Sequence, residues 1–290
     1  RNQSMLELLL QQAVNGLTQG MAYALVALGL TMIFGVLHII NFSHGELYML
    51  GGLMAVVATT MLGLPYGLAL VLAVVAVVAI AALVDLVAVR PVLPTKDGPS
   101  TVLLSTFAVS LLLHQSVLST WGPNPSRVEG LAGSLSLGPI VITNHRLLVL
   151  VSGVVILLAI EYVLRRTLVG RRIRAVAQSE FAAQVVGIDV ARIRTLTFLG
   201  AAAIAAIAGA LIAPVSLFTP SMGQHAIITA FVVVVIGGMG NATGAVVCGL
   251  LLGLLEALAS AFMPQDMGTA VIYALLLIFL LIRPQGLFAG

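Results

Sequence analysis

The chain has 290 residues, of which 60% are hydrophobic and only 8% are charged. A soluble domain carries about 25% charged residues, so this composition excludes a soluble globular protein and predicts an integral membrane protein. The formal net charge is only +3. The basic residues cluster beside apolar segments, which indicates a membrane-topology signal and excludes nucleic acid as a partner.

Apolar stretches of the length needed to cross a bilayer, roughly 20 residues, follow one another along the chain. We predict membrane spans at 13–36, 41–62, 66–89, 101–120, 146–164, 195–215, 243–263 and 268–282. A shorter apolar segment, 226–240, either crosses the bilayer or re-enters it. The predicted fold is an all-α polytopic membrane protein with about eight or nine transmembrane or partly spanning helices, in a single domain over 1–290.

The second span opens on a polar sequence. Ser43 and Glu46 have the spacing of a capping box, in which each side chain accepts an N–H bond at the helix end. Capping leaves Asn41 and His44 unexplained. A polar helix start at membrane depth can also present N–H groups to an anionic ligand group.

Seven of the thirteen Lys and Arg residues lie within the loop 165–194. Cytoplasmic loops carry an excess of basic residues, so this loop is predicted to lie in the cytoplasm, and the loop 121–145 and the amino terminus lie outside. The middle of the arginine loop, 175–186, has helix-forming composition and alternates apolar and polar residues. It is predicted to be a short amphipathic helix, which either docks on a cytosolic partner or is only a solvated basic segment.

Ionisable residues within spans are candidate sites. Glu161 precedes Arg165 by four residues and is predicted to pair with it. Asp85 lies near Arg90 at the end of its span, where it either extends to the membrane surface or pairs with Arg90. Glu256 lies in an apolar span without a charged neighbour in the sequence. It either forms a hydrogen bond to another helix or takes part in transport, and the same alternatives apply to His114.

Glycines gather late in the chain. Gly249 and Gly253 have the spacing that lets transmembrane helices pack closely. The cluster from Gly237 to Gly244 is either a further close-packing site or an unwound break within the bilayer, which is tolerated only where it is buried or lines a cavity.

The sequence contains no nucleotide-binding loop, no dinucleotide fingerprint and no metal-ligand spacing. We therefore expect no enzymatic activity and no bound cofactor in this chain itself.

Several motifs together resemble the permease subunits of bacterial ABC importers for branched-chain amino acids and related small amides. The segment Ile40-Asn41-Phe42-Ser43-His44-Gly45-Glu46 is close to the family's Ile-Asn-Phe-Ala-His-Gly-Glu signature. The other matching segments, which bring the coverage to nearly the whole chain, are Asn15-Gly16 through Leu25, Gly29-Leu30-Thr31-Met32, Arg90-Pro91, Gly170-Arg171-Arg172, Gly187-Ile188, Val235-Ile236-Gly237-Gly238-Met239-Gly240, Gly244-Ala245, Glu256-Ala257-Leu258 and Arg283-Pro284-Gln285-Gly286-Leu287-Phe288.

The resemblance assigns roles to individual residues. It implies that the arginine loop contains a coupling helix, in which the residues that would contact an ATPase are Glu180, Ala182, Ala183 and Gly187. Phe181 stands where the general importer pattern has Glu, and Thr229 stands where several family members have Lys. The residues implied to shape or brace the translocation route are Asn41, His44, Glu46, Gly237, Gly238 and Gly240.

The resemblance also implies partners. They are a second homologous permease subunit, two cytosolic ATPases that bind ATP and Mg²⁺, an extracytoplasmic substrate-binding protein and the lipid of the bacterial inner membrane. The cargo is a branched-chain amino acid, urea or another amide, or an aromatic acid, and the permease pair is a homodimer or a heterodimer. The alternatives are an ion-coupled secondary transporter, in which Glu256 and His114 would be the ionisable groups, and a membrane module that transports nothing.

Overall fold

The structure is a computed structural model that describes residues 2–137 and 140–262, together with residues 270, 274, 278, 279, 281, 282, 286 and 287. The described chain is largely helical. Its α-helices are α1 (Asn2–Leu37), α2 (Ser43–Val56), α3 (Tyr66–Val84), α4 (Gly98–Trp121), α5 (Asn144–Arg166), α6 (Leu168–Gln178), α7 (Glu180–Val185), α8 (Val190–Ser216), α9 (Met222–Gly237) and α10 (Ala242–Ser260). Two π-helical segments, η1 (Val57–Met61) and η2 (Asp85–Val89), extend α2 and α3.

Six helices in the described part of the chain are long and apolar enough to cross a membrane. They are Glu7–Leu37, Tyr66–Val89, Gly98–Trp121, Asn144–Arg166, Val190–Ser216 and Ala242–Ser260. These helices, together with the shorter α2 and α9, confirm an all-α polytopic membrane protein. The predicted span 268–282 falls largely outside the described residues, and Arg283 lies outside them.

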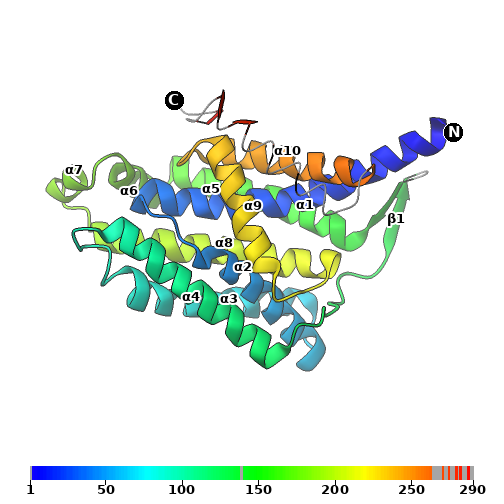
Figure 1. The fold of residues 1–290 in the computed structure, drawn as a ribbon, viewed down its shortest axis with the longest axis horizontal. Helices are drawn as coiled ribbons and strands as arrows, with labels where there is room; N and C mark the ends of the chain where they lie inside the picture. The colour runs from blue at the N-terminus through cyan, green and yellow to red at the C-terminus, as the bar shows by residue number, and fades with distance from the viewer. Residues whose placement is uncertain are drawn as a thin grey trace.

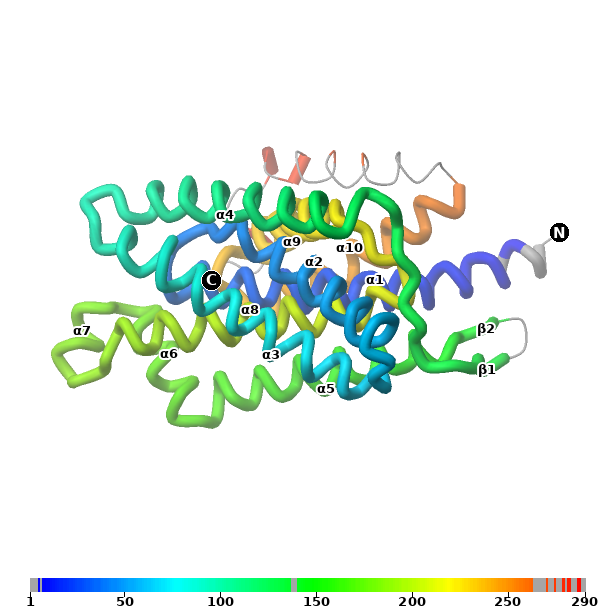
Figure 2. The backbone as a smooth tube through the Cα atoms, turned by 90° about the horizontal axis from the view of Figure 1, so that it is seen from below, coloured from blue at the N-terminus to red at the C-terminus, as the bar shows by residue number. Residues whose placement is uncertain are grey.

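The long helices run roughly parallel, so the molecule has two ends (Figure 1). The amino terminus and the hairpin of β1 (Ser134–Leu137) and β2 (Ile140–Thr143) lie at one end, and α6 and α7 lie at the other (Figure 2). Because the arginine loop forms α6 and α7, we assign their end to the cytoplasm. The hairpin end is then the outer end.

The β1–β2 hairpin corrects the expectation of a plain loop over 121–145. The two strands pair antiparallel, and Gln11 of α1 binds the edge of β2. The Gln11 amide donates to the carbonyl of Val141 at 3.1 Å and accepts the N–H of Val141 at 3.0 Å. The alternating Ser and Leu residues of 134–137 are the strand signal that the sequence contains here.

Helices α1 and α8 form the centre of the bundle, because most of the apolar length of each is buried. In contrast, α3, α4 and α5 bury only 28%, 22% and 11% of their most apolar segments. Large exposed side chains on these three helices, such as Val75, Phe107 and Val155, are apolar. A surface of this kind is stable against acyl chains, so we expect α3, α4 and α5 to face lipid.

Small residues bring the central helices close together. At Gly20 of α1, an added Cβ would lie 2.9 Å from the carbonyl oxygen of Leu250 on α10. At Gly249 of α10, it would lie 2.7 Å from the Cα of Ala24. These approaches confirm the close packing predicted from the spacing of Gly249 and Gly253.

Candidate functional site: coupling surface and polar pathway

The arginine loop forms two short helices rather than the single helix predicted at 175–186. The hydroxyl of Ser179 accepts a hydrogen bond from the N–H of Ala182 at 3.2 Å and caps α7. A serine cap favours a new helix start, which explains why α6 ends before Ser179. After α7, Gly187 has a φ of 81°, a left-handed conformation that favours glycine at a helix end.

The four predicted coupling residues fall into two groups. Glu180 forms an ion pair with Arg194 of α8, and Ala183 is buried, so these two residues hold α7 against the bundle. Ala182 and Gly187 are exposed at the cytoplasmic end. No described atom lies within 4 Å of a Cβ added at Gly187, so the surface there is open to a partner.

Three large apolar side chains face the solvent on α7 and at the residue that follows it, and we call this group the α7 tip. Phe181, Val185 and Val186 are 78%, 71% and 73% exposed. Apolar area of this size left in water is unfavourable in an isolated protein and marks an interaction site. In the sequence, Phe181 stands out only as a departure from a family pattern, because its exposure depends on how α7 lies on α8.

The predicted ion pair between Glu161 and Arg165 is present, and Asp85 pairs with Arg90, which was one of its two alternatives. Glu161 and Arg165 lie 3.0 Å apart. Arg90 Nε lies 2.8 Å from Asp85 Oδ2, and the hydroxyl of Thr195 on α8 donates to the same oxygen at 2.9 Å. The Asp85 side chain is almost fully buried, so this network fixes η2 to α8 close to the arginine loop.

Two helices begin next to each other inside the bundle. A Cβ added at Gly29 of α1 would lie 2.8 Å from the ring of His44, on the first turn of α2. Gly29 lies about 12 Å of helix before the cytoplasmic end of α1. Helix α2 therefore begins in the interior of the bundle and not at its cytoplasmic end. A Cβ added at Gly223 of α9 would lie 2.7 Å from the carbonyl oxygen of Gly45. Helices α2 and α9 therefore meet at their amino ends, in the manner of discontinuous transmembrane helices.

The three polar residues predicted for the pathway at the start of α2 are fully buried. Asn41, His44 and Glu46 each have an exposed fraction of 0%. Asn41 Oδ1 accepts hydrogen bonds from the N–H and the hydroxyl of Ser43, at 3.0 and 2.6 Å. His44 Nε2 lies 3.1 Å from the carbonyl oxygen of Val26. Their position suits bracing of a route rather than direct contact with a solute.

The capping box predicted for Ser43 and Glu46 is wrong. Phe42 occupies the cap position of α2, and its side chain makes no capping hydrogen bond. Glu46 Oε1 instead accepts a hydrogen bond from the hydroxyl of Ser110 at 3.3 Å. The buried carboxylate thus connects α2 to α4, while Asn41 satisfies the Ser43 N–H.

The glycine run after α9 makes a tight reversal into α10. Gly238 and Gly240 have φ angles of 99° and 86°, which glycine adopts at little cost. A Cβ added at Gly237 would lie 2.6 Å from the carbonyl carbon of Gly244, so the run provides both a break and close packing. The reversal packs beside the carboxyl end of α1, which shows that 226–240 leads to the cytoplasmic end.

A polar cavity of about 150 Å³ lies beside the amino end of α9, next to the outer end of α8. Its lining includes Gln19, Tyr23, Tyr48 and His225. The Tyr23 hydroxyl donates a hydrogen bond to Glu256 Oε2 of α10 at 2.8 Å. This bond confirms the interhelical contact predicted as one alternative for Glu256.

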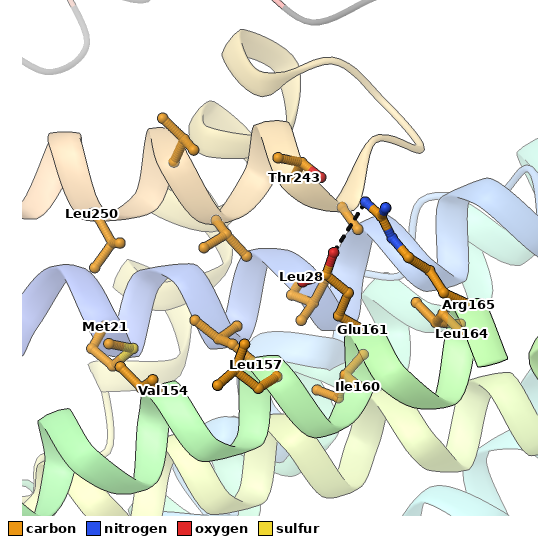
Figure 3. Close-up of a pocket in the computed structure, with 14 residues that line it drawn as sticks. Met21, Leu28, Val154, Leu157, Ile160, Glu161, Leu164, Arg165, Thr243 and Leu250 are labelled. Atoms are coloured by element: carbon orange, nitrogen blue, oxygen red, sulfur yellow. Dashed lines mark ion pairs between the residues drawn. The ribbon is translucent and has the colours of Figure 1, made fainter. Parts of the chain in front are cut away.

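A second cavity, of about 370 Å³, lies between α1, α5 and α10 and is mainly apolar (Figure 3). Leucine and valine side chains line most of it, and the Glu161–Arg165 ion pair stands at its edge. A polar solute needs hydrogen-bonding groups at fixed positions. This second cavity offers them only at the edge where the Glu161–Arg165 ion pair stands. The polar cavity beside α9 is therefore the better candidate for the solute route.

Comparison with known proteins places these features in a family. Residues 12–280 match the family described as the permease component of branched-chain amino acid transport systems. The high-affinity branched-chain amino acid permease protein LivH of Escherichia coli is 36% identical over 293 residues, covering 96% of this chain and 94% of LivH. BraD, a high-affinity branched-chain amino acid permease protein of Pseudomonas aeruginosa, is 32% identical over 291 residues, covering 96% of this chain and 95% of BraD. FrcC, a fructose import permease of Rhizobium meliloti, is 32% identical over 191 residues, covering 62% of this chain and 53% of FrcC.

Proposed function

The chain belongs to the permease family of branched-chain amino acid transport systems, and from this membership we propose that it forms half of the pathway of an ATP-driven importer in the bacterial inner membrane. ATP and Mg²⁺ bind to partner subunits in this proposal, and this chain catalyses no reaction itself. The observation that supports it best is the α7 tip, an exposed apolar patch at the cytoplasmic end. Such a patch fits a groove on a cytosolic ATPase.

The proposed second permease subunit covers the side of α9 and α10 that carries polar groups. Glu256 is half-buried and His225 is exposed, although both belong to apolar helices. A charged group in contact with hydrocarbon costs about 3 kcal/mol or more. This side is therefore expected to face protein or a water-filled route, whereas α3, α4 and α5 face lipid.

The proposed binding protein approaches the outer end. There the β1–β2 hairpin is fixed to α1 through Gln11. A hollow of about 740 Å³ at the start of α3 has Arg127 and Glu129 in its lining. A hairpin held to α1 beside a hollow with charges of both signs offers shape and polar contacts to a docking protein.

We propose branched-chain amino acids as the cargo. LivH and BraD are named for these solutes, and each aligns with 96% of the chain. The fructose permease aligns with only 62%. The ion-coupled alternative has no support, because Glu256 bonds to Tyr23 rather than pairing with His114.

The substitution Gly187→Arg tests the coupling role. We expect the variant subunit to remain in the membrane but to lose ATP-dependent leucine uptake in proteoliposomes that contain the complete importer. The reason is that the arginine side chain projects into the open surface where the ATPase would dock.

Gly187→Ala is the matched control, because it imposes the same backbone strain, about 1–2 kcal/mol, without the bulk. It should retain most of the uptake. Normal uptake by the arginine variant, or leucine accumulation by this subunit alone, would contradict the proposal.

A further inference from the structure

The apolar cavity between α1, α5 and α10 is a groove that opens at the surface of the bundle. Its volume is about 370 Å³, and the three helices that line it are all long and apolar enough to span the membrane. Val154 and Leu158 of α5 and Val247 of α10 line the groove and are exposed. Exposed apolar side chains at this depth are stable against hydrocarbon or another protein, so the groove needs an apolar occupant.

The groove has the length of one membrane leaflet. On α5 its lining runs from Val154 to Arg165, which is about 16 Å at about 1.5 Å per residue. The hydrocarbon core of a bilayer is about 30 Å thick, so one leaflet contributes about 15 Å. Arg165 lies at the cytoplasmic end of the groove, and Met21 and Leu250 lie at its other end (Figure 3). The groove therefore fits an acyl chain that enters from the cytoplasmic leaflet and reaches the middle of the bilayer.

Basic side chains stand at the end where the head of such a lipid lies. Arg165 lines the groove, and Arg166 follows it at the end of α5. Arg165 pairs with Glu161 at 3.0 Å, but the two side chains are 67% and 52% exposed. An ion pair this exposed contributes little to stability, so the Arg165 guanidinium is free to turn to a phosphate, which it binds through two parallel hydrogen bonds.

The surrounding charge favours an anionic lipid over a zwitterionic one. Residues 161–174 contain five arginines and one glutamate. Basic residues at the cytoplasmic surface attract anionic lipids, and basic pockets between spanning helices bind their head groups.

The second permease subunit is the other candidate for covering the groove. Its proposed contact is the side of α10 that carries Glu256. Val247 and Glu256 are nine residues apart in α10, about two and a half turns of helix, so they lie on opposite sides of it. Val247 thus points away from the proposed subunit contact, which leaves lipid to cover the groove.

We propose that this groove binds an anionic phospholipid of the cytoplasmic leaflet, with an acyl chain against Val154, Leu157 and Leu250 and the phosphate on Arg165. Glu161 competes with the phosphate for the Arg165 guanidinium. The bound lipid joins α5 to α1 and α10 beside the arginine loop. This assignment depends neither on the cargo nor on the ATPases, so its failure leaves the proposed function standing.

Two substitutions in the ion pair test the head-group contact, because they have opposite expected effects. The full-length subunit is purified in detergent and titrated with dioleoyl phosphatidylglycerol, and native mass spectrometry measures the fraction that retains a lipid. We expect Arg165→Gln to weaken the apparent affinity roughly fivefold, the effect of one basic residue at a membrane surface. Glu161→Gln removes the competing carboxylate and should strengthen the affinity by about twofold. Both variants break the same ion pair, so a purely structural role would move the affinity in the same direction in both.

The substitution Val247→Trp tests the acyl-chain contact, because the indole ring fills the groove. We expect it to weaken phosphatidylglycerol binding roughly tenfold. Leu251→Trp is the matched control, because Leu251 is also an exposed apolar residue of α10 but does not line the groove. This control should bind the lipid as the wild type does.

Dioleoyl phosphatidylcholine, which has no net charge, is the control lipid and should bind the wild-type subunit roughly fivefold more weakly than phosphatidylglycerol. Equal binding of the two lipids overturns the proposal. Wild-type affinity for phosphatidylglycerol in either Arg165→Gln or Val247→Trp also overturns it, and so does a dimer of the subunit that retains no lipid.

Discussion

Phe181→Asp is expected to insert into the membrane normally and to lose the ATPase subunits during purification. The Phe181 side chain is 78% exposed in the isolated subunit, so its replacement removes no contact within the bundle. Burying a phenylalanine in a partner's groove is worth about 1.5–3 kcal/mol, and a buried unpaired carboxylate adds a further penalty. The affinity for the ATPase should therefore fall roughly thirtyfold or more.

Co-purification of the ATPases on the tagged permease measures this effect. Leu135→Asp is the control, because Leu135 is also an exposed apolar residue, 49% exposed, but lies on the hairpin at the outer end. It should recover the ATPases in full. Equal recovery with both variants would show that the α7 tip is not the docking surface.

The membrane-spanning helices follow from the sequence because the bilayer imposes a length. Each of the six spanning helices in the described part of the chain overlaps one predicted span, and α10 ends at Ser260, three residues before the predicted end. The orientation follows from the arginines of the loop 165–194, because this loop contains α6 and α7 at one end of the molecule (Figure 1). The spans and the orientation depend on local composition, so they can be predicted from a single sequence.

The interior of the site depends on contacts between distant segments, which local composition does not contain. Glu46 has the spacing of a capping residue, yet it bonds to Ser110, 64 residues later. The partner of Glu256 is Tyr23, 233 residues earlier. The sequence therefore indicated which polar residues are unusual, whereas the structure was needed to find their partners.

The helical segment predicted within the arginine loop is present, although the sequence described it incompletely. The basic loop marks the segment, and its serine and glycine residues mark helix ends. The sequence does not show which side of α7 packs on α8, so the outward position of Phe181, Val185 and Val186 was not predicted. Ala183 and Glu180 turn inward instead, and the family pattern alone does not separate these two roles.

Gly209→Ala is expected to destabilise the folded subunit, although alanine is the better helix former. Gly209 lies in the buried middle of α8, and a Cβ there would overlap the carbonyl oxygen of Tyr48 on α2. Backbone atoms cannot rotate away, so α2 must shift and the contacts around the start of α2 must loosen. Overpacking of this kind costs about 1–3 kcal/mol, which should lower the thermal midpoint of the detergent-purified protein.

Gly200→Ala on the same helix isolates the cause. No described atom lies within 4 Å of a Cβ added at Gly200, so this variant gains the helix preference of alanine, up to about 1 kcal/mol, without a clash. Its thermal midpoint should stay level or rise while that of Gly209→Ala falls. If both midpoints moved in the same direction, glycine content rather than the approach of α2 to α8 would set the stability. The discontinuous start of α2 would then not depend on that approach.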